Sequence, residues 1–307
     1  MKRAVFHMEY LPLALLAAVF WIAFYVVPGF NQSWMIPVVT QNASYHGIIA
    51  LGLLPVLISG NIDLSVGAQM SFYGVLCAVC IKNGWPIWLA VSVTLLSALL
   101  IGCIQGAVIA GWHLNSILVS ISMSMFLIGV SNGLNRGSVI LNLPSRIVSL
   151  GRFETLGLSL PTLVWIAAAL FMALVLRQTY WGRFFYAVGF NALAAERAGV
   201  PILPTKMVAF GLDSLFCALS SLVYISQLGF APLSNGQDAT YSVLTIAALS
   251  GVSFSGGRGK VSLVVLGGLM AGALPPLFTL AGVPTYFQNC IKSLILFVAI
   301  STNFLKS

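Results

Sequence analysis

Long, nearly uncharged runs of apolar residues recur along the whole of this 307-residue chain, and they limit its possible folds more than any other feature. Each run has about 17 to 25 residues, the length that an α-helix needs to cross a hydrocarbon core about 30 Å thick. Charged residues make up only 7% of the sequence, against about a quarter in soluble domains. The chain is therefore predicted to be an all-α protein that crosses a membrane many times.

Gly, Pro and polar residues divide these runs into about ten predicted spans. The first run is longer than the apolar region of a secretory signal, and no small-x-small cleavage site follows it, so we interpret it as a retained span. Residues 1–307 are predicted to form a single transmembrane domain. The expected spans lie near residues 10–28, 43–59, 64–81, 86–110, 115–134, 160–177, 207–228, 240–254, 261–281 and 286–304.

The distribution of Lys and Arg predicts the orientation of the chain. With the N-terminus in the cytoplasm, nine of these residues lie on the inner side and four on the outer side, as the positive-inside rule requires. This topology places both termini in the cytoplasm, with an outer loop near 135–160 and an inner loop near 178–206. The inner set is Lys2, Arg3, Arg177, Arg183, Arg197, Lys206, Arg258, Lys260 and Lys306, and the outer set is Lys82, Arg136, Arg146 and Arg152. The net charge of +8 is explained by topology, and no nucleic-acid partner is predicted.

The sequence contains no motif for ATP hydrolysis or for catalysis. The segment SGGRGKVS only partly fits the phosphate-binding pattern G-x-x-x-x-G-K-S/T, because Phe254 and Val261 occupy two of its required positions. We interpret Ser255 to Lys260 as a tight cytoplasmic turn. The five cysteines lie in apolar segments without a nearby His cluster, so neither a metal nor a redox site is predicted. We expect no cofactor and no catalytic activity.

Ionisable residues inside apolar segments are costly in lipid, which makes them candidates for function. Asp213 and Lys292 are the intramembrane polar candidates, together with His46. Asp63 and His113 are expected near the ends of spans, where both could contact water. An ion-coupled secondary carrier would use Asp213 or Lys292 for coupling. That class, and a membrane scaffold that transports nothing, stay open on the residues alone.

The sequence GFNALAAERAGVP in the inner loop predicts a short helix outside the membrane. Asn191 suits the N-cap, and Ala192 to Ala198 form a strongly helix-favouring run. Gly199 suits a left-handed residue after the helix, and Pro201 prevents its continuation. A stiff element between two spans could transmit force from another protein. An ordinary surface loop with one helical turn is the alternative.

Four motifs, in order, resemble the permease subunits of ATP-binding-cassette importers of the ribose, xylose and autoinducer type. ISGNIDLSVGAQMS resembles the family's GGIDLSVGS segment, and WGRFFYAVGFNALAAERAGV resembles its GR-x-x-x-A-x-G-x-N-x-x-A-A-x-x-x-G-I cytoplasmic motif. SGVSFSGGRGKV resembles GGTSLSGGRGS, and YFQNCIKSLILFVAI resembles YYQQIVKGLVIILAV. The resemblance extends from about residue 40 to residue 304.

The resemblance implies a ten-helix importer fold in the bacterial inner (cytoplasmic) membrane and a permease subunit for a sugar or sugar-like small solute. The implied partners are a cytoplasmic ABC ATPase subunit, a periplasmic or extracytoplasmic solute-binding protein, and a second permease that forms a homo- or heterodimer. The motif assigns Gly182, Arg183, Gly189, Asn191, Ala194, Ala195 and Gly199 to the ATPase-coupling loop. It assigns Ile62, Asp63, Leu64, Ser65 and Gly67 to the IDLSVG segment.

Asp63 in the IDLSVG segment has three candidate roles: a helix cap, a gate near the pathway, or a solute contact. We expect the first, because a carboxylate can accept hydrogen bonds from the exposed N–H groups at the start of the third span. A chain break could then form without leaving backbone polar groups unpaired in lipid.

Several residues depart from the family pattern. Asn61 replaces the second Gly of the usual Gly-Gly pair, and Asp213 stands where Ser is usual. Ser214 and Ser221 stand where Gly is usual, and no acidic residue follows Asp238. These departures leave the substrate open, and they are compatible with pairing to a non-identical permease.

Overall fold

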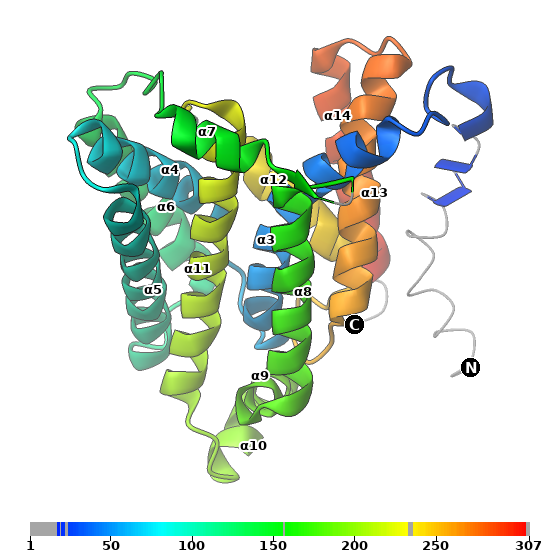
Figure 1. The fold of residues 1–307 in the computed structure, drawn as a ribbon. Helices are drawn as coiled ribbons and strands as arrows, with labels where there is room; N and C mark the ends of the chain where they lie inside the picture. Colours follow the sequence, from blue (N-terminus) through cyan, green and yellow to red (C-terminus); the bar gives the residue numbers. More distant parts are fainter. Residues whose placement is uncertain (1–16, 19, 22–23, 156, 233–235, 305–307) are drawn as a thin grey trace.

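The computed structural model describes residues 17–18, 20–21, 24–155, 157–232 and 236–304 (Figure 1). The predicted first span, near residues 10–28, lies largely outside the described residues. The long helices are α3 (Met35–Ile58), α4 (Val66–Lys82), α5 (Ile87–Gly111), α6 (Ser116–Leu134), α8 (Leu160–Gln178), α11 (Ile202–Leu228), α12 (Gln237–Leu249), α13 (Val261–Leu280) and α14 (Thr285–Phe304). The short elements are α7 (Ser145–Gly151), α9 (Tyr180–Phe190), α10 (Ala192–Arg197), and the antiparallel strands β1 (Glu154–Thr155) and β2 (Leu158–Ser159).

The described part of the chain is mostly helical, as the sequence predicts. Six of its helices, α3, α5, α6, α8, α11 and α13, are long and apolar enough to cross a membrane. Helices α4 and α12 are apolar but shorter. These features agree with the predicted class of an all-α membrane protein.

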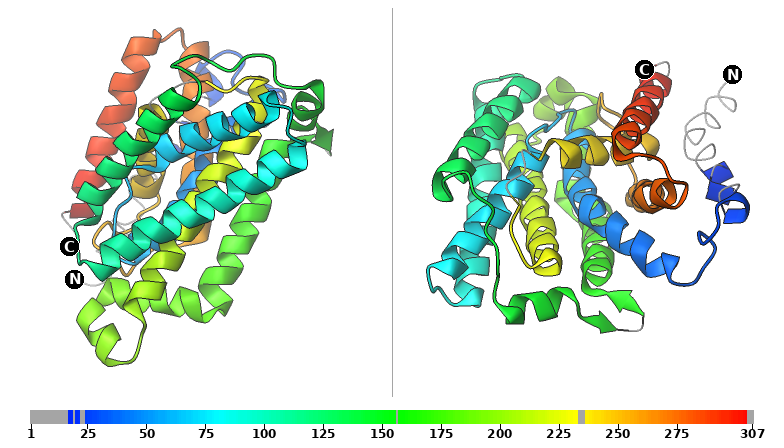
Figure 2. Two further views of the ribbon diagram at one scale, coloured as in Figure 1. Left: turned by 90° about the vertical axis from the view of Figure 1, so that its left-hand side faces the viewer. Right: turned by 90° about the horizontal axis from the view of Figure 1, so that it is seen from above.

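Helix α3 passes through the centre of the bundle and forms its core. It packs against α8, α11, α12 and α13 (Figures 1 and 2), and its residues from Gly47 to Ile58 are all buried. Helices α5 and α6 lie at the periphery, where apolar side chains such as Leu100 (63% exposed) and Phe126 (64% exposed) face outward. An apolar outer surface of this kind is stable only in contact with lipid or another apolar partner.

Several helix limits differ from the sequence-based expectation. Helix α3 begins at Met35, eight residues before the expected start at 43, because the polar side chains in its first turns bond to their own backbone. The Oγ1 of Thr40 donates to the carbonyl of Ile36, and Nδ2 of Asn42 donates to that of Val38. Helix α12 ends at Leu249 rather than near 254, because Gly251 has a positive φ of 65°. A polar side chain that forms its hydrogen bond with a carbonyl group of the preceding turn does not interrupt the helix.

Both predicted polar loops contain secondary structure that the sequence did not indicate. The outer segment holds α7 and the β1–β2 hairpin, and the inner segment holds α9 as well as the predicted α10. Figure 1 places α9 and α10 at one end of the bundle, and α7 and the hairpin at the other end. The two loops are therefore at opposite ends, as the alternating topology requires.

Glycines allow α5 and α11 to approach each other closely. A Cβ atom at Gly102 of α5 would lie 2.3 Å from the carbonyl oxygen of Phe210 and 2.7 Å from Cβ of Ser214. A Cβ atom at Gly129 of α6 would meet nothing within 4 Å. Small residues at helix contacts are typical of membrane bundles, in which close backbone approach increases van der Waals contact.

We expect Gly102→Ala to destabilise the folded protein by about 1 to 3 kcal/mol, because the added methyl group forces α5 away from α11. The matched variant Gly129→Ala should be neutral or stabilising by up to about 1 kcal/mol, since it only removes backbone freedom from the unfolded chain. Thermal unfolding of the purified protein in detergent measures both effects. Equal unfolding temperatures for the two variants would contradict the close packing.

Candidate functional site

The chain break between α3 and α4, residues 59–65, is mostly buried, with only Gly60 exposed. Helix α3 ends at Ile58, and Gly60 has a positive φ of 78° that turns the chain. The Nδ2 of Asn61 donates to the carbonyl oxygen of Ser59 (3.1 Å), and the N–H of Ile62 donates to Oγ of Ser116 (3.1 Å). The break thus finds partners within the protein, which irregular backbone needs at membrane depth.

The N-terminal ends of α4 and α12 meet at two glycines. A Cβ atom on Gly67 would lie 1.9 Å from the carbonyl oxygen of Gly236, so no other residue fits at Gly67 without a shift of the backbone. The N–H of Gly67 donates to Oγ1 of Thr240 (3.2 Å). Two positive helix ends would repel each other without nearby negative charge. Asp63 precedes α4, and Asp238 lies in the first turn of α12.

The carboxylate of Asp63 is fully buried beside this junction. Its Oδ1 accepts from the N–H (2.7 Å) and the hydroxyl group of Ser65. Its Oδ2 accepts from Nε2 of Gln105 (2.9 Å) and from Nε2 of Gln69 (3.3 Å). The expectation that Asp63 contacts water is wrong, because the break folds inward against α5.

The structure also refines the expected capping role. The N-cap residue of α4 is Ser65, without a side-chain capping bond. Asp63 bonds to the N–H of that N-cap residue, so it fixes the turn that leads into the helix rather than the first helical N–H groups.

Asp213 of α11 is brought to the same junction. It is fully buried, and its carboxyl group interacts with that of Asp63 across the contact between α11 and the break. Among the described residues, no hydrogen-bond donor reaches either carboxyl oxygen of Asp213. The sequence separates the two aspartates by 150 positions and therefore gives no sign that they meet.

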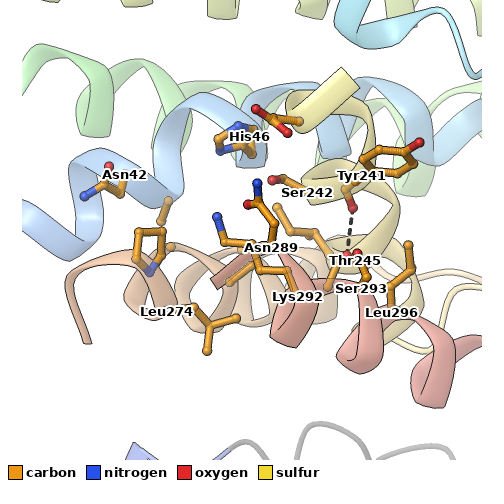
Figure 3. A pocket seen from close by; sticks show the side chains of 17 residues that line it. Asn42, His46, Tyr241, Ser242, Thr245, Leu274, Asn289, Lys292, Ser293 and Leu296 are labelled. Atoms are coloured by element: carbon orange, nitrogen blue, oxygen red, sulfur yellow. Dashed lines mark hydrogen bonds between the residues drawn. The ribbon is translucent and has the colours of Figure 1, made fainter. Parts of the chain in front are cut away.

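Two of the other ionisable candidates, His46 and Lys292, meet in a polar cavity of about 220 Å³ between α3, α12, α13 and α14. His46 enters from α3, Asp238 from α12 and Lys292 from α14. Figure 3 shows His46, Asn289 and Lys292 extending into the same space. The polar lining residues are Asn42, His46, Asp238, Tyr241, Ser242, Thr245, Asn289, Lys292 and Ser293.

This cavity offers both donors and acceptors to a small polar molecule. A second cavity of about 340 Å³ shares His46 and Asp238 with it and extends to Gly67 and Gly236, where α4 and α12 meet. The two cavities thus adjoin along the polar interior of the bundle. Convergent amides, hydroxyl groups and charges over apolar walls are typical of sites for small solutes.

The sequence singled out His46 and Lys292, but not Asn42 or Asn289. In α3, Asn42 and His46 are four residues apart, and in α14, Asn289 and Lys292 are three apart. These spacings put each pair on one helix face. Polar pairs at helical spacing in two apolar segments were the signal that could have identified the cavity.

The inner loop contains the predicted helix with the predicted ends. Asn191 is the N-cap of α10, and its Oδ1 accepts from the N–H of Ala194 (2.9 Å). Gly199 follows the helix with a φ of 85°. Leu193 remains 69% exposed and Phe190 87% exposed, so this end of the bundle presents apolar side chains that no other described residue covers.

Helix α9, which the sequence did not predict, connects this loop to the break. A Cβ atom at Gly189 would lie 1.7 Å from the carbonyl oxygen of Ile58, the last residue of α3. The hydroxyl group of Tyr186 donates to the carbonyl of Gly259 (2.7 Å). The turn from Ser255 to Lys260 has the predicted left-handed glycines, with φ of 94° at Gly256 and 75° at Gly257.

The remaining residues of the predicted coupling loop are distributed between the two short helices. Gly182 is buried against the end of α8, where a Cβ atom would lie 2.3 Å from the carbonyl oxygen of Leu176. Arg183 and Ala194 are exposed, whereas Ala195 is buried.

Ile62 and Leu64 of the IDLSVG segment are half-buried, and Ser65 and Gly67 are buried.

Comparison with known proteins relates the chain to transport permeases. Residues 35–300 match the family described as "Branched-chain amino acid transport system / permease component". The L-arabinose transport system permease protein AraH of Escherichia coli (strain K12) is 30% identical over 95% of this chain and 89% of its own length. The autoinducer 2 import system permease protein LsrC of Escherichia coli (strain K12 / DH10B) is 30% identical over 92% of this chain and 83% of its own length.

A relative from another genus is also named as a transport permease. The L-arabinose ABC transporter permease protein AraH of Azospirillum brasilense is 28% identical over 89% of this chain and 81% of its own length. No solved structure matches the chain.

The contact of Tyr186 with Gly259 predicts a specific loss of stability. Burial raises the pKa of Tyr186, while nearby Arg177 lowers it, so the net shift keeps the phenol protonated as a donor at neutral pH. Tyr186→Phe should cost about 1 kcal/mol, because the carbonyl of Gly259 loses its partner. The matched variant Tyr180→Phe, at a position 52% exposed, should change stability by less than about 0.5 kcal/mol. Thermal unfolding in detergent compares the two, and an equal loss in both variants would count against the contact.

Proposed function

The chain belongs to the family of branched-chain amino acid transport system permease components, and we propose that it is the membrane-spanning subunit of an ATP-driven, binding-protein-dependent importer. Two relatives that are each 30% identical are named for the import of L-arabinose and of autoinducer 2. We therefore infer a sugar or sugar-like small solute as the substrate class.

The lining of the polar cavity supports this substrate class. The cavity presents the amides of Asn42 and Asn289, the hydroxyl group of Ser242 and the imidazole of His46 beside apolar walls. Such groups can form hydrogen bonds with the hydroxyl groups of a solute. An apolar solute would leave these buried polar groups without a partner, which disfavours its binding.

The observation that carries the coupling role is the exposed apolar surface at the α10 end of the bundle. Leu193 projects from α10, whose ends are fixed by Asn191 and Gly199, and Phe190 is the last residue of α9, directly before it. Exposed apolar side chains of this kind fit an interaction site. We propose that a separate cytoplasmic ATPase subunit docks there, with the coupling loop at about 178–206 between them.

The proposed mechanism follows from the contacts of α9. ATP-driven closure of the partner displaces α10, and α9 transmits this displacement to the end of α3 and to the turn from Ser255 to Lys260. The pathway then alternates between outward and inward access. Closure must favour one of these states for the energy of ATP to be used.

We further propose ten spans, with both termini in the cytoplasm and the protein in the bacterial inner membrane. The opposite end of the bundle, with α7 and the β1–β2 hairpin, carries the exposed cations Arg146 and Arg152 and is the proposed contact for an extracytoplasmic solute-binding protein. A second permease, identical or not, completes the pathway.

Uptake in vesicles that contain the permease, its ATPase and its binding protein should require internal ATP. L-Arabinose and a panel of other monosaccharides serve as test solutes. Uptake that persists without ATP and stops when the proton gradient is removed would exclude this function and favour a secondary carrier.

Replacement of Lys292 by Met tests the cavity. We expect it to lower uptake about 10-fold to 100-fold, the effect of losing one charged hydrogen bond to the solute. Lys82→Met removes an exposed Lys at the end of α4, far in sequence from the cavity-lining residues, and should leave uptake unchanged. Equal uptake by the two variants would show that the solute passes elsewhere.

Replacement of Gly199 by Val tests the coupling element. An added Cβ atom would meet nothing within 4 Å, so only the positive φ opposes the change, and a β-branched residue resists it strongly. We expect Gly199→Val to abolish co-purification of the ATPase while the permease still inserts. Gly199→Asn, which also adds a side chain but tolerates this backbone region, should retain most binding. Loss of binding in both variants to the same degree would contradict the conformational explanation.

A further inference from the structure

The carboxyl groups of Asp63 and Asp213 form a buried pair whose surroundings are unequal. Both side chains are 0% exposed, and each interacts with the other. The pair lies where the break between α3 and α4 meets α5 and the middle part of α11. Neither residue lines the polar cavity, so the pair is separate from the proposed solute site.

Asp63 is surrounded by donors. Its two oxygens accept hydrogen bonds from the backbone N–H and hydroxyl group of Ser65 and from the amides of Gln69 and Gln105. A carboxylate with this number of donors is stabilised in its ionised form, even when it is buried.

Asp213 has the opposite environment. Both of its oxygens lack a donor among the described residues. Its neighbour in sequence, Ser214, bonds to the hydroxyl group of Tyr73 (2.5 Å) rather than to Asp213. Two ionised carboxylates in contact inside an apolar bundle would leave one charge without compensation, at a cost far above that of an ordinary unpaired polar group.

We propose that Asp63 and Asp213 form a proton-binding site, in which Asp213 carries the proton and donates it in a hydrogen bond to the carboxylate of Asp63. One bound proton converts two facing acceptors into a donor and an acceptor, and the pair keeps a single negative charge. Serine, the usual residue at position 213 in the family that the sequence resembles, would supply one hydroxyl donor to Asp63 in the same way.

The proton links the folding of the protein to pH. The folded pair holds the proton at neutral pH, whereas an aspartate in the unfolded chain releases it. The folded state therefore binds more protons than the unfolded state, and stability decreases as the pH rises. The hydrogen bond fixes the break to α11, so loss of the proton should loosen this contact first.

Other groups around the pair do not replace this proton. Tyr73 from α4 and Cys217 from α11 are the titratable groups that interact with the pair, and both are protonated and uncharged near neutral pH. Helix α5 contributes the amide of Gln105, and α3 contributes the backbone at Gly52, where a Cβ atom would lie 3.2 Å from Cα of Asp213.

Infrared spectroscopy of the purified permease detects the proton directly. We expect the carbonyl stretch of one protonated, buried carboxyl group at neutral pH in the unmodified protein. Asp213→Asn and Asp213→Ser should both lose this band, and Glu154→Gln, which removes an exposed carboxylate, should keep it. Absence of the band from the unmodified protein at neutral pH would overturn the proposal.

Thermal unfolding between pH 6 and pH 9 gives an independent measurement. As the pH rises, the unfolding equilibrium constant should increase more in the unmodified protein than in Asp213→Ser. The difference should be up to about tenfold for each pH unit, which is the effect of one linked proton. Glu154→Gln should keep the slope of the unmodified protein. Equal slopes in the unmodified protein and in Asp213→Ser would overturn the proposal. Stabilisation by added sodium that requires Asp213 would also overturn it, because sodium would then occupy the site. Neither readout involves transport, so a failure here is distinguishable from a failure of the proposed function.

Discussion

The structure depends on one constraint: inside an apolar bundle, each break in a helix must find its hydrogen-bond partners within the protein. Two such breaks occur where α4 and α12 begin, and they are placed against each other. The polar side chains of Ser65, Gln69 and Gln105 surround one break, and Thr240 bonds to the other side of the junction. This requirement explains why the most polar interior of the protein lies beside its core helix, α3.

The same constraint divides the ionisable residues into two sets with different chemistry. Asp63 and Asp213 are enclosed and belong to the architecture of the break. His46, Asp238 and Lys292 line a cavity that a solute could occupy. The separation matters for interpretation, because a charged residue in a membrane helix is a candidate for function by default, and here only the second set lies where a small molecule would fit.

The sequence predicted the class of fold, most helix positions and the short α10 helix, because apolar length, caps and glycines are local signals. It misplaced the start of α3, since Thr40 and Asn42 look like interruptions until their bonds to the preceding turn are seen. It missed α9, because YWGRFFYAVGF is too short and too mixed for a span. The contact of Asp63 with Asp213 arises from packing between distant segments, which a single sequence does not encode in any readable pattern. The spacing of the polar pairs in α3 and α14 marks two polar helix faces, but it does not show that these faces meet.

Helix α9 touches two segments at once, the last residue of α3 and the turn that leads into α13. Helices α3 and α13 both line the polar cavity, and they pack directly against each other. In the proposed mechanism, a displacement of α9 would therefore reach two cavity-lining helices together. A single eleven-residue helix is thus the link through which both would respond at the same time.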